Sequence, residues 1–305
     1  METHNDNSVA IRVSQVTRTF GEVSALGGVS FTVAKNSICG LLGSNGAGKT
    51  TLMALIAGHD RPTSGELTVL GQTPFESAEV AAATSFIRDN QRFPDDYKLK
   101  HVLRIAKEFH ANWDAEFANQ LVAEFRIPAK TQVKKFSRGQ LSALSIVIAM
   151  AARAPITIFD EPYLGLDVAS RHRFYELLMQ DYAAHPRTII VSTHLVGEME
   201  AIFDHAVILE LGQIVLDSPI EDLSGVAYRV SGRTESVQMF TGSKNVLSTR
   251  VLGAMSVSVI QEPLTEGAKA LAELDGLVTE PVSLQDLVGA LGSQSASDNT
   301  NGVAA

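Results

Sequence analysis

The chain has little of several features that define other classes of protein. Its 305 residues include one cysteine, Cys39, so no disulfide can form within the chain, and this favours a reducing cytoplasm. The longest apolar run, residues 141–152, contains two serines and is shorter than the roughly 18–20 residues that span a membrane. Residues 1–8 are polar and lack the apolar core of a secretion signal. We therefore expect a cytoplasmic protein with no direct membrane insertion.

Positive charge is also scarce. The sequence has 25 Lys and Arg residues against 34 Asp and Glu residues, which gives a formal net charge of −9. Nucleic-acid-binding proteins neutralise phosphates with clustered Lys and Arg, so we expect no nucleic acid partner and no polybasic membrane anchor. With 45% hydrophobic and 19% charged residues, the chain can bury a core, and its length suits one large or two modest domains.

The most specific segment of the sequence is residues 43–50. It matches the phosphate-binding loop pattern G-x-x-x-x-G-K-[ST] at every fixed position, between an apolar run and a helix-compatible run. The glycines let successive backbone N–H groups point inward, and the following helix presents its positive end to the phosphates. Lys49 is expected to reach the β- and γ-phosphates and Thr50 to ligate Mg²⁺. The sequence therefore predicts binding of a nucleoside triphosphate.

A second motif ends in two carboxylates. Residues 156–159 predict a buried strand, and Asp160, Glu161 and Pro162 follow it. An aspartate at the end of such a strand can hold the Mg²⁺ shell, and the adjacent glutamate can orient or deprotonate an attacking water. A solvated acidic strand end is the alternative. Ligands of α/β proteins bind at the carboxyl ends of strands, and this favours the functional interpretation.

A third motif, residues 136–140, precedes the predicted helix over residues 141–152. Ser137 can simply cap that helix. The other interpretation is a second helix end that faces a phosphate. Because the loop at Gly43 already serves the nucleotide of its own subunit, such a helix end would face the nucleotide of a partner subunit.

Strands and helices alternate along much of the chain, which predicts an α/β fold with a mainly parallel sheet covered on both faces. The predicted strands are residues 9–16, 29–33, 38–42, 66–70, 156–159, 188–192, 206–210 and 213–216. The predicted helices of this region are residues 51–57, 76–83, 169–182 and 195–203. Residues 99–152 have a helical apolar pattern throughout and predict a helical subdomain inserted in the sheet.

We divide the chain into four parts on this pattern. Residues 1–8 are expected to be disordered, and residues 9–223 to form the nucleotide-binding domain, with the helical insertion at about 90–152. Residues 224–292 predict a small α+β extension, with short strands at 228–230 and 251–260 and helices at 266–274 and 284–291. Residues 293–305 are rich in Ser, Asn, Ala and Gly and are expected to form a disordered tail.

The order of five segments resembles the nucleotide-binding subunit of an ABC transporter over roughly residues 9–223. These segments are residues 43–50, 136–140, 156–162, 164–167 and 192–194. Within that family, the chain is most similar to the single-domain ATPases of bacterial exporters and to their YtrB-like branch. Trp113 and Asp114 ahead of the third motif and the run at residues 159–167 carry this finer resemblance. The resemblance implies a P-loop NTPase fold with antiparallel N-terminal strands.

The resemblance implies a role for each matching residue. Phe20 would stack on adenine, with a core aromatic as the open alternative. The residues that would wrap the phosphates are Gly43, Ser44, Asn45, Gly46, Ala47, Gly48, Lys49, Thr50 and Thr51. Asp160 would hold Mg²⁺ through water, Glu161 would be the catalytic base, and His194 would contact the γ-phosphate.

Other matching residues would serve a dimer. Asp167 would lie at its interface, and Ser137, Gly139 and Gln140 would close over ATP bound to the opposite subunit. Two positions depart from the family. Arg138 stands where the signature usually has glycine. Asp89 stands where a glutamine normally meets Mg²⁺ and the attacking water, and Gln91 would serve only with a two-residue shift.

The resulting hypothesis is an ATP-hydrolysing subunit that drives export. Two ATP molecules would lie between two head-to-tail subunits, identical or related, and closure of this dimer would move a separate integral membrane permease. The subunit would then sit at the inner face of the cell membrane, held there by its partner. A soluble ABC ATPase with a mechanical or regulatory task is the alternative, and a phosphoryl-transfer kinase is a weaker one.

Overall fold

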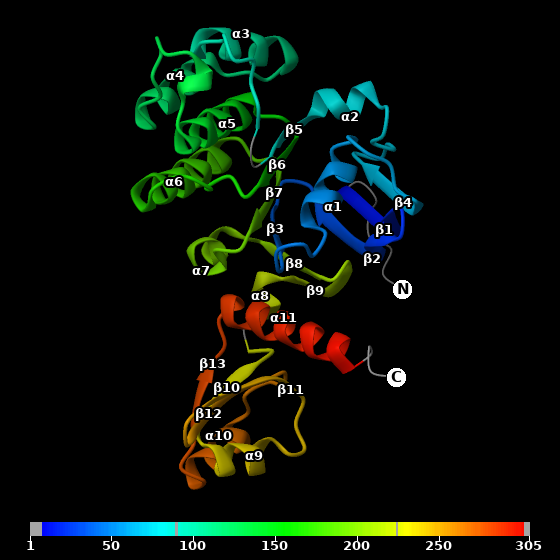
Figure 1. Ribbon diagram of the computed structural model, residues 1–305, viewed down its shortest axis with the longest axis vertical. Helices are drawn as coiled ribbons and strands as arrows, with labels where there is room; N and C mark the ends of the chain where they lie inside the picture. The colour runs from blue at the N-terminus through cyan, green and yellow to red at the C-terminus, as the bar shows by residue number, and fades with distance from the viewer. Residues whose placement is uncertain (1–7, 89–90, 224, 302–305) are drawn as a thin grey trace.

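The computed structural model describes residues 8–88, 91–223 and 225–301 of the chain. The ATPase region and the C-terminal region lie at opposite ends of the molecule, with the last helix between them (Figure 1). Asp89 therefore lies outside the described residues, as do residues 1–7 of the expected disordered N-terminus.

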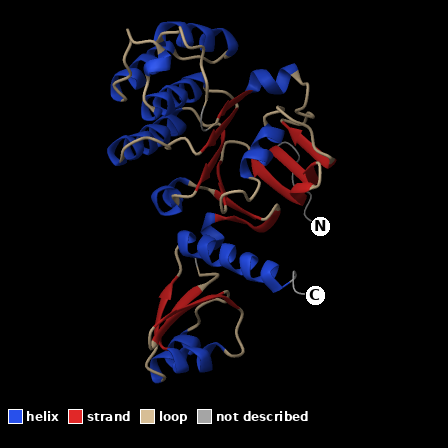
Figure 2. Ribbon diagram, in the orientation of Figure 1, coloured by secondary structure: helices blue, strands red, loops and turns tan. Residues whose placement is uncertain are grey.

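A six-stranded sheet forms the centre of the ATPase region (Figure 2). Its order is β5-β6-β7-β3-β8-β9, and every neighbouring pair is parallel except β8 and β9. The strands are β3 (Ile38–Leu42), β5 (Thr84–Ile87), β6 (Ile156–Asp160), β7 (Thr188–Thr193), β8 (His205–Glu210) and β9 (Gln213–Pro219). All residues of β3, β6 and β7 are buried, as expected for parallel strands covered on both faces.

A second sheet is antiparallel and has the order β2-β1-β4. Its strands are β1 (Val9–Phe20), β2 (Val23–Ala34) and β4 (Ser64–Val69). Helix α1 (Lys49–Ile56) buries Leu52, Met53 and Leu55 in an apolar cluster shared by both sheets. This packing holds the helix that follows the phosphate loop against two rigid layers.

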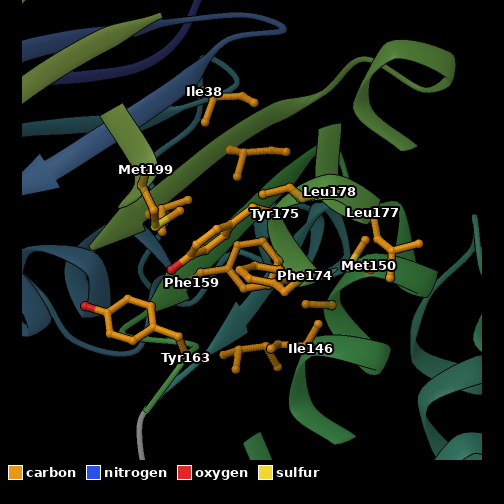
Figure 3. Packing of buried hydrophobic residues seen from close by; sticks show 14 of the residues in the cluster. Ile38, Ile146, Met150, Phe159, Tyr163, Phe174, Tyr175, Leu177, Leu178 and Met199 are labelled. Atoms are coloured by element: carbon orange, nitrogen blue, oxygen red, sulfur yellow. The ribbon is translucent and has the colours of Figure 1, made fainter. Parts of the chain in front are cut away.

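Helices surround the main sheet and fill the insertion between β5 and β6 (Figure 1). They are α2 (Ala78–Ala83), α3 (Leu99–Phe109), α4 (Ala115–Glu124), α5 (Arg138–Ala152), α6 (Val168–Ala184), α7 (Val196–Met199) and α8 (Ile220–Leu223), with 3₁₀ turns η2 (Val133–Lys135) and η3 (Glu200–Ile202). Every residue of α5 from Ala143 onward is buried. Figure 3 shows this core, where Ile146 and Met150 lie beside Phe159 and Phe174.

The C-terminal region has a four-stranded antiparallel sheet of order β11-β12-β10-β13. Its elements are β10 (Tyr228–Arg233), α9 (Thr234–Thr241), β11 (Val246–Leu252), β12 (Met255–Ile260), α10 (Glu266–Leu274), β13 (Val278–Pro281) and α11 (Leu284–Asn301). The architecture matches the predicted fold class. No local pattern in the sequence predicts β5, α8, α9 or β13, and the sequence predicts one β segment where β11 and β12 form a hairpin.

Helix α11 continues to Asn301, so it includes residues 293–301, for which the sequence predicts a disordered tail. Extending an existing helix adds one hydrogen bond for each residue fixed and avoids the cost of nucleation, so a polar segment can follow an apolar one in the same helix.

Helix α11 packs against the ATPase region. Its buried residues Leu284, Leu287, Ala290 and Leu291 belong to the same apolar cluster as Met199, next to α7 and β8. The backbone N–H of Leu284 also donates to Glu200 Oε1 at 3.3 Å. Helix α11 therefore shares a core cluster with the ATPase region, and the extension also has a smaller cluster of its own around Tyr228 and Phe240.

The shared core predicts a stability effect. Leu287→Ala should lower the free energy of unfolding by about 2–5 kcal/mol, because a buried leucine is replaced by a cavity. Urea denaturation measures this change. Leu274→Ala is the matched control, since Leu274 on α10 is 85% exposed, and its unfolding should not change measurably. Equal effects of the two substitutions would contradict the packing of α11.

Candidate nucleotide-binding and hydrolysis site

The loop between β3 and α1 has a backbone that only glycine adopts easily. Gly43, Gly46 and Gly48 have φ values of 138°, 84° and 109°. A Cβ atom at Gly43 would lie 1.9 Å from the carbonyl oxygen of Leu209, and one at Gly48 would lie 2.7 Å from that of Ala25. The fixed glycines of the motif are thus required by both conformation and space.

Lys49 lies across this loop. It is 7% exposed, and its Nζ donates to the carbonyl oxygens of Gly43 and Ser44, each at 2.8 Å. Burial lowers the pKa of Lys49, while the nearby carboxylates of Glu161, Asp160 and Glu210 raise it. The ammonium group is therefore held in place by the loop it serves.

Asp160 connects the phosphate loop to the neighbouring strands. Its Oδ2 accepts from Thr50 Oγ1 at 2.8 Å, and its Oδ1 accepts from Ser192 Oγ at 2.7 Å. Ser192 Oγ in turn accepts the backbone N–H of Glu161 at 3.0 Å. These contacts join the carboxyl ends of β6 and β7 to the first turn of α1.

Glu161, Tyr163 and His194 form a polar cluster next to Asp160. Glu161 has φ of 49°, a left-handed conformation that is uncommon for a side chain of its size. His194 Nδ1 lies 2.8 Å from Glu161 Oε2, and the Tyr163 hydroxyl contacts the same oxygen. Glu161 Oε1 is buried and has no hydrogen-bond partner among the described residues. Burial and the Glu161 carboxylate raise the pKa of Tyr163, so its hydroxyl stays protonated.

A hollow of about 280 Å³ lies at the loop. Its lining consists of Val23, Ser24, Ala25, Asn45, Gly46, Gly48, Lys49, Thr50, Thr51, Asp160 and Glu161. Phe20 is not part of the lining, but it pairs with Val23 across the β1–β2 hairpin. Phe20 is 49% exposed, which rules out a core aromatic, and the Arg18 guanidinium lies 4.4 Å from its ring centre.

The first turn of α5 holds the third motif. Ser137 Oγ accepts the N–H of Gln140 at 3.2 Å, and the Gln140 side chain accepts the N–H of Ser137 at 3.0 Å, which makes a capping box. A Cβ at Gly139 would lie 2.4 Å from the Gly165 carbonyl oxygen, so this turn touches the loop before α6. Ser137, Gly139 and Gln140 do not line the hollow at the phosphate loop of their own chain.

Asp167 ends the loop before α6. Its carboxylate accepts the N–H of Ser170 at 2.8 Å, a hydrogen bond that lowers the pKa of Asp167. Gln91, the alternative to Asp89, lines a different hollow between β5 and α3.

Three residues of this region have contacts that the sequence does not predict. Ser192 and Tyr163 fall within recognised motifs, but no local pattern gives them a partner. Glu210 accepts the N–H of Ser44 at 2.8 Å and Ser44 Oγ at 2.6 Å from 166 residues away, and it is 3% exposed. Only the three-dimensional contact identifies it.

The fold and the phosphate loop define an α/β nucleotide-binding protein of the P-loop class. Residues 26–164 match the family model described as "ABC transporter". Residues 26–164 therefore form a domain of the ABC transporter family, and this domain makes the chain an ABC-type ATPase. Among residues 8–88, 91–223 and 225–301, no helix combines the length and the apolar character needed to cross a bilayer.

Two curated relatives illustrate the similarity. The ABC transporter ATP-binding protein YtrB of Bacillus subtilis (strain 168) is 25% identical over 280 residues, which are 91% of this chain and 96% of that protein. A match of this length extends into the C-terminal region. The Nod factor export ATP-binding protein I of Rhizobium meliloti (strain 1021) is 30% identical over 69% of this chain and 64% of its own length.

Solved structures show the same fold. An ATP-binding subunit of an ABC transporter has a TM-score of 0.64 and 27% identity, covering 70% of this chain and 91% of its own. A bacterial Atm1-family ABC exporter with ATP bound has a TM-score of 0.61 at 22% identity, covering 71% of this chain and 40% of its own. The latter likeness is one of fold alone.

The contact of Glu210 with the phosphate loop predicts a local stability effect. Glu210→Ala should lower the free energy of unfolding by about 1–3 kcal/mol, because both polar groups of Ser44 lose their acceptor. Glu210→Gln, which keeps one acceptor oxygen, should cost less. Urea denaturation of the two variants tests this order, and an unchanged unfolding midpoint in Glu210→Ala would contradict it.

Proposed function

We propose that this chain is the ATP-hydrolysing subunit of an exporter and works as a dimer with two ATP molecules at its interface. The observation that carries the proposal is that the third motif lies outside the lining of the hollow at the phosphate loop. The N-terminus of α5 around Ser137 is exposed and capped, and its residues do not line the hollow beside Lys49 in their own chain. A head-to-tail partner supplies each phosphate loop with the missing helix end.

Mg²⁺ fits the donors beside the loop. The Thr50 hydroxyl and the Asp160 carboxylate are hard oxygen ligands, which Mg²⁺ prefers. Across the described ranges, no three His, Cys, Asp or Glu side chains gather as a metal cage. Mg²⁺ is often held by one or two protein oxygens together with substrate phosphates, so this set is sufficient. When bound, Mg²⁺ neutralises phosphate charge during transfer of the γ-phosphoryl group.

Glu161 and His194 take the chemical roles in this proposal. The free, buried Oε1 of Glu161 is available to accept a proton from the attacking water, while Oε2 is engaged by His194 and Tyr163. Lys49 and the loop before α1 bind the phosphates, and His194, which is half exposed, faces the γ-phosphate. Phe20 stacks on the adenine, and Asp167 lies at the dimer interface.

The permease is proposed to dock between the sheet and the helical insertion. A groove of about 390 Å³ lies there, with a mainly apolar lining that includes Phe86, Phe93, Tyr97 and Phe109. Gln91, the alternative to Asp89 as the residue that meets Mg²⁺ and the attacking water, also lines this groove. Export, rather than import, is proposed because relatives include the Nod factor export ATP-binding proteins. The subunit then sits at the inner face of the membrane.

The dimer is tested with Glu161→Gln. This variant should lose about 100-fold or more of its ATP turnover, because the general base is removed while ATP binding is kept. It should therefore form a dimer with ATP, measured by size-exclusion chromatography with light scattering. Lys49→Ala combined with Glu161→Gln is the control and should stay monomeric, since ATP no longer binds. A Glu161→Gln variant that remains monomeric with ATP refutes the dimer.

The permease is tested by purification from membranes. The wild-type chain should recover an integral membrane protein, and Phe109→Glu should reduce the yield about tenfold, because it places a charge in the apolar groove. Leu274→Glu, on the exposed surface of α10, is the matched control and should leave recovery unchanged. Recovery of no membrane protein by the wild-type chain would support the non-transport alternative.

A further inference from the structure

Tyr163 is buried although it lies in the loop between β6 and α6. The residue is 2% exposed, and its ring is edge-on to the His194 ring at 5.6 Å between centres. Figure 3 shows this ring apart from the group of Phe159, Phe174 and Tyr175, with its hydroxyl directed away from them. The hydroxyl therefore contacts polar groups rather than the apolar core.

The neighbours of this hydroxyl determine the direction of its hydrogen bonds. Thr193 Oγ1 donates to it at 2.9 Å, and the backbone N–H of His194 donates to it at 3.0 Å. Because a hydroxyl has two acceptor lone pairs and one proton, these two donors fill its acceptor capacity. Its own proton is left for Glu161 Oε2, which it contacts. Tyr163 is thus fixed as a donor to the carboxylate.

The two oxygens of Glu161 consequently differ. Oε2 is engaged by the Tyr163 hydroxyl and lies 2.8 Å from His194 Nδ1, whereas Oε1 is buried without a partner among the described residues. A carboxylate held at one oxygen cannot exchange its two oxygens by rotation without breaking that contact. The hydroxyl also touches His194 Nδ1 at 3.1 Å, so one group contacts both side chains.

We propose that Tyr163 is a positioning residue for hydrolysis: its hydroxyl holds Glu161 by Oε2 and His194 by its backbone, so that Oε1 points to the attacking water. This inference rests on the proposed role of Glu161 as the base. Tyr163 does not line the hollow at the phosphate loop, so it acts through Glu161 and His194. Burial and the hydrogen bond to the Glu161 carboxylate raise the pKa of Tyr163, which agrees with a hydroxyl that donates.

The test is Tyr163→Phe in the full-length chain, which keeps the ring and removes only the hydroxyl. Steady-state ATPase assays with Mg²⁺ should show kcat lowered about 10- to 100-fold and KM for ATP changed less than about twofold, because alignment is lost and binding is kept. Tyr175→Phe is the matched control. Tyr175 is 6% exposed, and its hydroxyl contacts Glu198 at 3.4 Å. The kcat of the Tyr175→Phe variant should stay at the wild-type value.

Two further measurements separate positioning from folding and from the proposed function. The fraction of each preparation that binds ATP is titrated, and kcat is expressed per binding-competent subunit. If the loss in Tyr163→Phe vanishes after this correction, its role is structural and the inference is overturned. If Glu161→Gln lacks turnover while Tyr163→Phe turns over like the wild type, Tyr163 is dispensable but the base assignment stands. If Glu161→Gln keeps its turnover, the proposed function itself fails.

Discussion

The site depends on the two hydrogen bonds that the carboxylate of Asp160 accepts. One oxygen accepts from Thr50 on α1 and the other from Ser192 on β7, while Asp160 itself ends β6. Since Ser192 also accepts the N–H of Glu161, the left-handed turn of Glu161 is fixed by the same network. A single buried side chain thus sets the spacing between the phosphate loop and the residues that follow β6.

The two halves of the site are built by different physical means. The phosphate loop relies on glycine conformations and on buried packing of α1 between two sheets. The α5 end relies on a capping box and on the close approach of Gly139 to Gly165, which links it to the loop that Asp167 ends. Gly165 follows β6 by a few residues, so the α5 end contacts the same loop that begins at the Glu161 turn.

Local patterns in the sequence predict the loop between β3 and α1 and several of the elements around it. The loop, the strand before Asp160 and helix α10 were each predicted from residues that are neighbours in sequence, and the predicted bounds of α10 match the structure. Tyr163 was not predicted because its partners Thr193 and His194 lie about 30 residues away. Strand β5 has only four residues, which is too short for an alternation of apolar and polar residues to be recognised. Helix α9 follows β10 with no turn residues between them, so the sequence does not mark where the strand ends and the helix begins.

Glu210 shows how the C-terminal extension reaches the nucleotide loop. Its carboxylate accepts hydrogen bonds from the backbone N–H and the hydroxyl of Ser44, and a Cβ at Gly292 of α11 would come within 3.2 Å of its Oε1. A side chain at this position in α11 would press on the carboxylate, so glycine permits the helix to approach. The packing of α11 and the geometry of the phosphate loop are therefore not independent, because both depend on where one buried carboxylate lies.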